Sequence, residues 1–238
     1  MKIFNETELA SIQRSINDDY SFYGVINPEE DRWRSWYTEA RGISTFQSKK
    51  NKPFWDMRCD GFGVEWKKNK FMFDSPEEVL GKRVGYVGSR VCALEKIDPD
   101  ARADMRRIAH RYNEIVKEFH DHCDGNAHHG IVIHSDDAVV YYETPAKTID
   151  TQDLRAEWIT ASGKENLQVF NEAGQKVFTF LPNGNKLSVV IENPSSMDEV
   201  HYFKAEQDVV WEPISSSFYA DFMARHPGQT FEQALGTI

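Results

Sequence analysis

The stretch PFWDMRCDGFGVEWKKN, residues 53–69, carries the clearest secondary-structure pattern of the chain. Apolar residues occupy every second position on both sides of Asp60-Gly61. These positions are Trp55, Met57, Cys59, Val64 and Trp66. A period of two residues is typical of β-strands, and Asp-Gly is a preferred pair for a tight hairpin turn. The segment therefore predicts a β-hairpin with one apolar face and one charged face.

Counting outward from the turn brings three charged residues together. With Asp60-Gly61 as a two-residue turn, Asp56 lies directly opposite Glu65. With a four-residue turn, Asp56 lies opposite Lys67 instead, and Glu65 stays on the same face because the strand period is two. Either register predicts that Asp56, Glu65 and Lys67 share one face.

Two neighbouring carboxylates repel each other, and a hard divalent cation such as Mg²⁺, which prefers oxygen ligands, relieves that repulsion. A phosphate oxygen can complete the shell of such an ion, and the ion can activate a bound water. Lys67 is placed to orient that water or to stabilise growing negative charge. We therefore predict Asp56 and Glu65 as metal ligands, and both of them with Lys67 as the catalytic cluster of a phosphodiester hydrolase.

These residues resemble the motif of the PD-(D/E)XK nucleases, the family of most restriction endonucleases. Asp56 corresponds to the first acid and Glu65-Trp66-Lys67 to the E-x-K triplet. Pro53 stands three residues before Asp56 instead of immediately before it, which leaves Asp60 as an alternative first acid. The resemblance implies a helix, a three-stranded antiparallel meander containing the hairpin, a crossover helix and a further strand. It also implies Glu39, in the preceding helix, as a further acidic group.

Periodicity along the rest of the chain supports an α+β (mixed α/β) fold. Expected helices cover residues 7–16 with a stop at Asn17-Asp18-Asp19, residues 29–41, residues 101–122 after a cap at Asp98-Pro99, and residues 215–225. Expected strands cover residues 130–134, 138–143, 167–171, 175–181 and 186–192. We expect one domain over residues 1–238. Its restriction-endonuclease-like core, a mixed sheet flanked by helices, covers about 33–143, and an antiparallel meander at about 150–238 serves recognition or dimerisation.

The net charge of −10, from 28 basic and 38 acidic residues, argues against a protein that coats nucleic acid nonspecifically. One short segment is nevertheless rich in basic residues, which predicts a local nucleic-acid contact if they share a face. They are Lys49, Lys50, Lys52, Arg58, Lys67, Lys68 and Lys70. For residues 49–52 taken alone, a solvated loop is an equal alternative.

The three cysteines, Cys59, Cys92 and Cys123, form no CxxC pair and predict packed thiols. No apolar run is long enough for a membrane span, and the first residues do not read as a signal peptide. We therefore expect a soluble cytoplasmic protein without membrane contact.

A histidine-rich segment offers a competing site with imidazole and thiol groups for zinc. Its residues are His120, His122, Cys123, His128, His129 and His134. Their spacing matches no zinc motif, so a polar helix end is the simpler interpretation. One histidine of the group could still approach the cluster as an acid or base, and the sequence does not say which.

The expected function is a Mg²⁺-dependent endonuclease that cuts double-stranded DNA at specific sequences as a homodimer. The homodimer follows from the resemblance, because symmetric cutting of a duplex suits two related sites. Two alternatives stay open. One is a non-catalytic nucleic-acid or protein-binding adaptor of phage or defence type, with Asp56, Glu65 and Lys67 as a surface ion-pair cluster. The other is a zinc enzyme that uses the segment His120–His134.

Overall fold

The computed structural model describes residues 3–43, 56–59, 61–70, 72–80, 87–90, 104–161, 163–182, 186–191, 194, 200–206 and 224. Several predicted features lie outside these residues. They are Trp55, the turn residue Asp60, the cap Asp98-Pro99, the turn Asn183-Gly184, and all of the predicted helix 215–225 except Ala224.

Within the described residues the chain forms helices and two five-stranded sheets. The helices are α1 (Glu6–Tyr23), α2 (Glu30–Ala40), α3 (Met105–His122) and the short 3-10 helix η1 (Pro76–Glu78). The first sheet has the order β1 (Met57–Cys59), β2 (Phe62–Lys70), β4 (Ala127–His134), β5 (Ala138–Pro145), β10 (His201–Lys204). The second has the order β3 (Val87–Arg90), β9 (Lys186–Val189), β8 (Lys176–Leu181), β7 (Lys164–Phe170), β6 (Arg155–Ala161). The protein is thus of the mixed α+β class.

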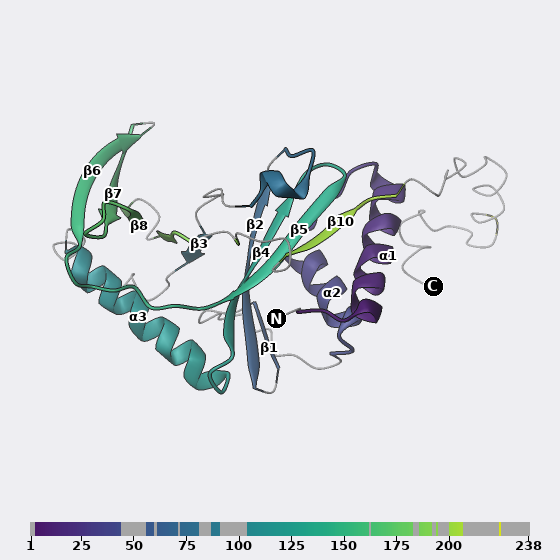
Figure 1. The fold of residues 1–238 in the computed structure, drawn as a ribbon, viewed down its shortest axis with the longest axis horizontal. Helices are drawn as coiled ribbons and strands as arrows, with labels where there is room; N and C mark the ends of the chain where they lie inside the picture. Colours follow the sequence, from purple (N-terminus) through teal and green to yellow (C-terminus); the bar gives the residue numbers. More distant parts are fainter. Residues whose placement is uncertain are drawn as a thin grey trace.

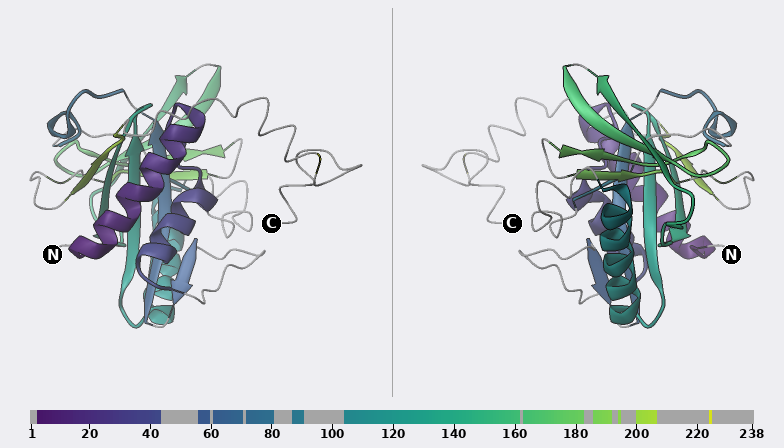
Figure 2. Two further views of the ribbon diagram at one scale, coloured as in Figure 1. Left: turned by 90° about the vertical axis from the view of Figure 1, so that its right-hand side faces the viewer. Right: turned by 90° about the vertical axis from the view of Figure 1, so that its left-hand side faces the viewer.

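The first sheet is covered on both faces. Helices α1 and α2 lie on one face, and α3 with the second sheet lies on the other (Figure 1). Two views turned by 90° show the same layers (Figure 2). None of the described helices is both long and apolar enough to cross a membrane.

Helix α1 is longer than predicted. The N-cap Asn5 and Glu8 form a reciprocal capping box, and Gly24 ends the helix with φ of 69°. The predicted stop at Asn17-Asp18-Asp19 is wrong. The Asn17 side chain accepts hydrogen bonds from Gln13 and from the Glu206 N–H, so it does not compete for the helix backbone.

Helix α2 agrees with its predicted range, and its Trp33, Trp36 and Tyr37 are buried as the apolar spacing indicates. Helix α3 begins at Met105 rather than near residue 101. Its N-cap is Asp104, whose carboxylate accepts the N–H groups of the next turn at 3.0 and 3.2 Å. The buried face of α3 otherwise follows the predicted spacing.

The hairpin of β1 and β2 confirms the register of the two-residue turn. Cys59 pairs with Phe62, and Met57 pairs with Val64. Gly61 has φ of 67°, a conformation that glycine adopts without strain. Met57 and Val64 are fully buried and Trp66 nearly so, which confirms the apolar face.

The link from β2 to β4 contains α3, and the two strands are parallel. β4 begins at Ala127, three residues before the predicted start, and then pairs antiparallel with β5. In this arrangement Glu65 of β2 lies beside His129 of β4, and His129 lies beside Thr144 of β5.

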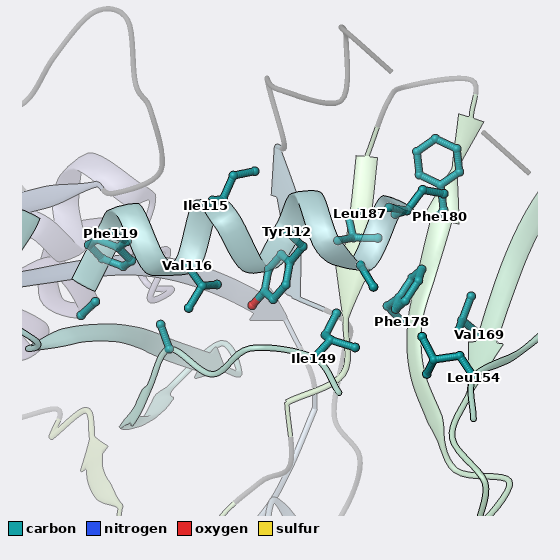
Figure 3. Close-up of a cluster of buried hydrophobic side chains, with 14 of the residues drawn as sticks. Tyr112, Ile115, Val116, Phe119, Ile149, Leu154, Val169, Phe178, Phe180 and Leu187 are labelled. Carbon is teal, nitrogen blue, oxygen red and sulfur yellow. The ribbon is translucent and has the colours of Figure 1, made fainter. Parts of the chain in front are cut away.

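The predicted C-terminal meander appears as β7, β8 and β9 in the second sheet. The sequence did not indicate β3, β6 or β10. Residues 155–160 of β6 are exposed on both faces, so this strand lacks the apolar alternation that marks half-buried strands. Side chains of α3 pack against this sheet, with Tyr112 near Leu187 and Phe178 (Figure 3).

Candidate active site

Asp56 is tied to β2 on both sides of Glu65. Its backbone N–H donates to the carbonyl oxygen of Val64 at 3.0 Å, and its carboxylate Oδ2 accepts the N–H of Trp66 at 2.7 Å. Asp56 is 4% exposed and directly precedes β1. Asp56 thus bonds to β2 through one backbone hydrogen bond and one side-chain hydrogen bond, and its carboxylate caps the end of the hairpin. The expected proximity of Asp56 to Glu65 is present.

Glu65 and Lys67 leave the same face of β2, opposite to Trp66, and they form an ion pair. Their side chains are 12% and 20% exposed. The pair is mostly sheltered from solvent, so its electrostatic interaction is screened less than that of a surface pair. The three predicted cluster residues are thus brought together at the start of the hairpin.

The structure adds His129 and Tyr112 to this cluster. His129 lies beside Glu65 across the parallel pair β2 and β4, and its Nε2 is 3.4 Å from the Tyr112 hydroxyl oxygen. Both residues are buried. The sequence indicated that one histidine of the group could approach the cluster, but the parallel pairing that selects His129 joins strands more than sixty residues apart.

Burial dominates the titration of both new members. It lowers the pKa of His129 to about 4, and the positive charge of Lys67 is the next cause. Burial also raises the pKa of the Tyr112 phenol, and the negative charge of Glu65 adds to this rise. His129 is therefore a neutral imidazole at neutral pH, and Tyr112 keeps its proton.

A second polar network lies on the opposite face of β2. The indole N–H of Trp66 donates to the Tyr141 hydroxyl at 3.1 Å. The hydroxyls of Tyr141 and Tyr37 donate to Oε1 of the buried Glu143 at 2.7 and 2.9 Å. A Cβ at Gly130 would overlap the Trp66 ring, so this position needs glycine. The network fixes Trp66, and with it the strand segment that carries Glu65 and Lys67.

The predicted basic patch is divided between the two faces. Strand alternation puts Arg58 and Lys67 on the face of the cluster, and Lys68 and Lys70 on the other face. Lys70 forms an ion pair with Asp136 there, at 2.7 Å. The condition of a shared face, on which the predicted nucleic-acid contact depended, is therefore not met by the described basic residues. Outside the described residues lie Lys49, Lys50 and Lys52.

Glu39 is exposed on α2. The buried aromatic side chains of α2 pack against the Trp66 face of the first sheet, whereas Glu65 leaves the other face. The structure does not bring Glu39 to the cluster, and its role as a further acid stays a prediction.

The histidine-rich segment does not converge on a metal centre. His120 lies with its two ring nitrogens 2.9 and 2.7 Å from the carbonyl oxygens of Gly125 and Ala146. His122 faces Glu118 at 3.7 Å on the exposed side of α3, and His134 is buried at the far end of β4. Cys59 and Cys123 are thiols, and Cys92 lies outside the described residues.

Asp56 and Glu65 supply carboxylate oxygens, the donors that Mg²⁺ prefers. No group of three or more His, Cys, Asp or Glu side chains in the described part of the chain is placed to hold a metal ion. An ion at Asp56 and Glu65 would therefore take its other ligands from water and substrate, which is how proteins commonly hold Mg²⁺. The chemical type of these donor atoms, carboxylate oxygen, therefore fits Mg²⁺.

Comparisons of the chain with protein-family models, curated proteins and solved structures found no match.

Proposed function

We propose that this protein is a Mg²⁺-dependent DNA endonuclease with Asp56, Glu65 and Lys67 as its reacting cluster. The observation that carries the proposal is the double attachment of Asp56 to β2. Its N–H and its carboxylate bond to the residues before and after Glu65, which holds two acids and Lys67 together in a sheltered place. A surface ion-pair cluster without chemistry does not need a buried second carboxylate.

The strand order supports a restriction-endonuclease-like core. An antiparallel hairpin, a link containing a helix, a parallel strand and an antiparallel strand follow one another in β1, β2, α3, β4 and β5. The hairpin, the helix and the further strand β4 come in the order that the resemblance to PD-(D/E)XK nucleases implies for the part after the first meander strand. In the described residues the antiparallel part consists of two strands, β1 and β2.

Each residue of the cluster has a defined task in the proposed reaction. Asp56 and Glu65 hold the cation by their carboxylates, and the Asp56 bond to the Trp66 N–H fixes the first acid in position. A bound Mg²⁺ would polarise the phosphate and lower the pKa of a bound water. Lys67 neutralises charge that grows on the phosphate oxygens. Burial around Glu65 and Lys67 strengthens these electrostatic effects.

The proposed substrate is double-stranded DNA, cut at specific sequences by a homodimer. Arg58 and Lys67 place positive charge on the face of the cluster, and the net charge of −10 disfavours indiscriminate binding elsewhere. Two copies related by a twofold axis suit the two strands of a duplex. The second sheet, attached through α3, is available for recognition or dimer contacts.

The test is incubation of the purified protein with a mixture of supercoiled, linear and base-modified DNA, in Mg²⁺ and in chelator. We expect fragments in Mg²⁺ and none in chelator. The double variant Asp56→Ala, Lys67→Ala, purified in parallel, should produce none in either condition and so controls for contaminating nuclease. Intact DNA with the wild type across the mixture, or equal cutting by the double variant, would contradict the proposal and favour a non-catalytic binding protein.

A further inference from the structure

One row of side chains leads from the cluster into a cavity. Glu65 on β2 lies beside His129 on β4, and His129 lies beside Thr144 on β5. Paired residues of neighbouring strands leave the same face, and neighbouring strands are about 4.8 Å apart. The row therefore runs about 10 Å from the proposed metal ligand Glu65 to Thr144.

His129 and Thr144 line a cavity of about 1020 Å³ between the first and second sheets. Its lining also includes Tyr112 and Tyr142, and Asn171 and Gln175 from the turn between β7 and β8. The volume is just above the usual range for small-molecule sites, about 300–1,000 Å³. Figure 3 shows Tyr112 on α3, with its hydroxyl directed away from Phe178 and Leu187 of the second sheet.

His129 carries a polar atom that has no partner among the described residues. It is 7% exposed, its Nε2 lies at the Tyr112 hydroxyl, and its Nδ1 makes no hydrogen bond there. With Tyr112 as donor to Nε2, the neutral ring carries its proton on Nδ1. A buried N–H without an acceptor is rare in proteins, because burial removes it from water. We therefore expect a ligand to supply the acceptor atom for Nδ1–H.

The charges around the cavity favour a neutral ligand. Its lining contains Lys147 and Lys176 but also Glu143, Asp150, Asp153 and Glu172. Four carboxylates against two lysines disfavour a bound phosphate. A nucleobase is neutral, flat and rich in carbonyl and ring-nitrogen acceptors.

We propose that this cavity binds an unpaired nucleobase next to the phosphate held at the Asp56–Glu65–Lys67 cluster. The His129 Nδ1–H donates to a carbonyl oxygen or ring nitrogen of that base, and Thr144 supplies a second polar contact. This inference rests on the proposed function, because the cluster supplies the reason for a nucleotide at this place. The base enters either from single-stranded DNA or by extrusion from a duplex, as in enzymes that read bases outside the stack.

The probes are the four deoxynucleoside 5′-monophosphates and deoxyribose 5-phosphate, titrated calorimetrically into the full-length protein in chelator. We expect at least one nucleotide to bind and the base-free sugar phosphate to bind at least about tenfold more weakly. His129→Ala should weaken the nucleotide at least about tenfold, and His129→Gln, which keeps an N–H donor, should weaken it less. Thr144→Val keeps the side-chain volume and replaces His129→Ala if that variant fails to fold. His122→Ala, an exposed histidine of α3, is the matched control.

Three results would overturn the cavity assignment. They are equal affinity for nucleotides and sugar phosphate, no nucleotide binding, and unchanged nucleotide affinity in folded His129→Ala and Thr144→Val. The two sources of the base are separated with single-stranded and duplex oligonucleotides that carry 2-aminopurine. Fluorescence that changes on duplex addition and is lost in His129→Ala indicates extrusion, whereas a change with single strands alone indicates an unpaired end. Since binding is measured in chelator, failure of the cavity assignment is distinct from failure of DNA cleavage.

Discussion

The two faces of β2 carry similar chemical groups in different states. On the Trp66 face, the buried Glu143 accepts two tyrosine hydroxyls, and Trp66 joins the same network. On the other face, Glu65 pairs with Lys67 beside a buried His129 whose Nδ1 has no partner in the described part of the chain. Each face thus combines a sheltered carboxylate with aromatic or imidazole groups.

The difference lies in where each face leaves a polar atom without a hydrogen bond: His129 Nδ1 on the Glu65 face belongs to a residue that lines a cavity, whereas His128 Nδ1 on the Trp66 face lies 3.8 Å from the Glu143 carboxylate. A buried polar group that is fully hydrogen-bonded holds the fold in one arrangement. A buried group without a partner, next to a cavity, costs stability and is typical of sites that await a ligand. We therefore assign stability to the Trp66 face and chemistry to the Glu65 face.

The largest expected effect separates the two carboxylates. Glu65→Gln should reduce Mg²⁺-dependent cleavage by about 100-fold or more, because it removes a charged metal ligand, and should change the free energy of unfolding by less than about 1 kcal/mol. Glu143→Gln should cost about 2 kcal/mol of stability, because a neutral amide oxygen accepts the two hydroxyl hydrogen bonds more weakly than a carboxylate oxygen does. Cleavage rates and urea unfolding of both variants check this. The reverse pattern would exchange the roles of the two faces.

Gly130 tests how closely the Trp66 face is packed. Gly130→Ala should reduce the free energy of unfolding by about 3 kcal/mol, since its methyl group overlaps the Trp66 ring and lies 2.8 Å from the Tyr141 hydroxyl oxygen. Urea denaturation measures the loss. Gly163→Ala, at a turn with no atom within 4 Å of the new methyl but with φ of 73°, reports the backbone strain alone. Equal losses in the two variants would mean that overlap with Trp66 contributes nothing.

The pKa of His129 predicts a contribution of the Glu65 face to the pH dependence of stability, beside those of His128 and His134 on the other face, whose pKa values burial also lowers. Because the folded pKa of His129 is about 4 and the ordinary value is 6.5, the unfolded chain takes up the proton first as the pH falls. The contribution is complete above about pH 6.5 and is lost as the pH falls toward 4. At about pH 5 the free energy of unfolding has fallen by about 2 kcal/mol through this titration. Urea unfolding at about pH 7 and about pH 5 should show this loss in the wild type and a smaller one in His129→Gln; identical losses would place the titration elsewhere.

The smallest effect concerns the lysine next to Lys67. Lys68 leaves the opposite face and donates to Asn27 at 3.2 Å, so Lys68→Ala should change DNA cleavage by less than about threefold. Lys67→Ala should reduce it by about 100-fold or more. Parallel cleavage assays at one salt concentration give both values. A loss of similar size in the two variants would show that the face of the strand does not matter.

Local sequence signals were sufficient for the hairpin and for the helix faces. Asp60-Gly61 and the two-residue period gave the register of Cys59 with Phe62, and with it the proximity of Asp56 to Glu65. The exception is the Asp56 side chain, which caps the strand end instead of pairing across it. Period alone does not tell a pairing strand residue from a capping one.

Long-range pairing was not predictable from the same signals. The choice of His129 among its neighbours depends on the parallel pairing of β2 with β4, and no local pattern encodes a strand's partner. β10 joins the edge of β5 from the far end of the described chain, and β6 lacks an apolar face. The division of the basic residues between two faces, by contrast, follows from strand alternation and was available from the sequence.

Asp56 and Glu65 are proposed to hold the metal ion that drives cleavage. The most direct test of this proposal is the Mg²⁺ dependence of the DNA cleavage rate in the wild type and in Asp56→Asn, with Lys204→Ala as the charge-changing control on β10. We predict that Lys204→Ala follows the wild-type curve and that Asp56→Asn loses about 100-fold or more in rate, or needs far more Mg²⁺ to recover. A wild-type rate with an unchanged Mg²⁺ dependence in Asp56→Asn would contradict it.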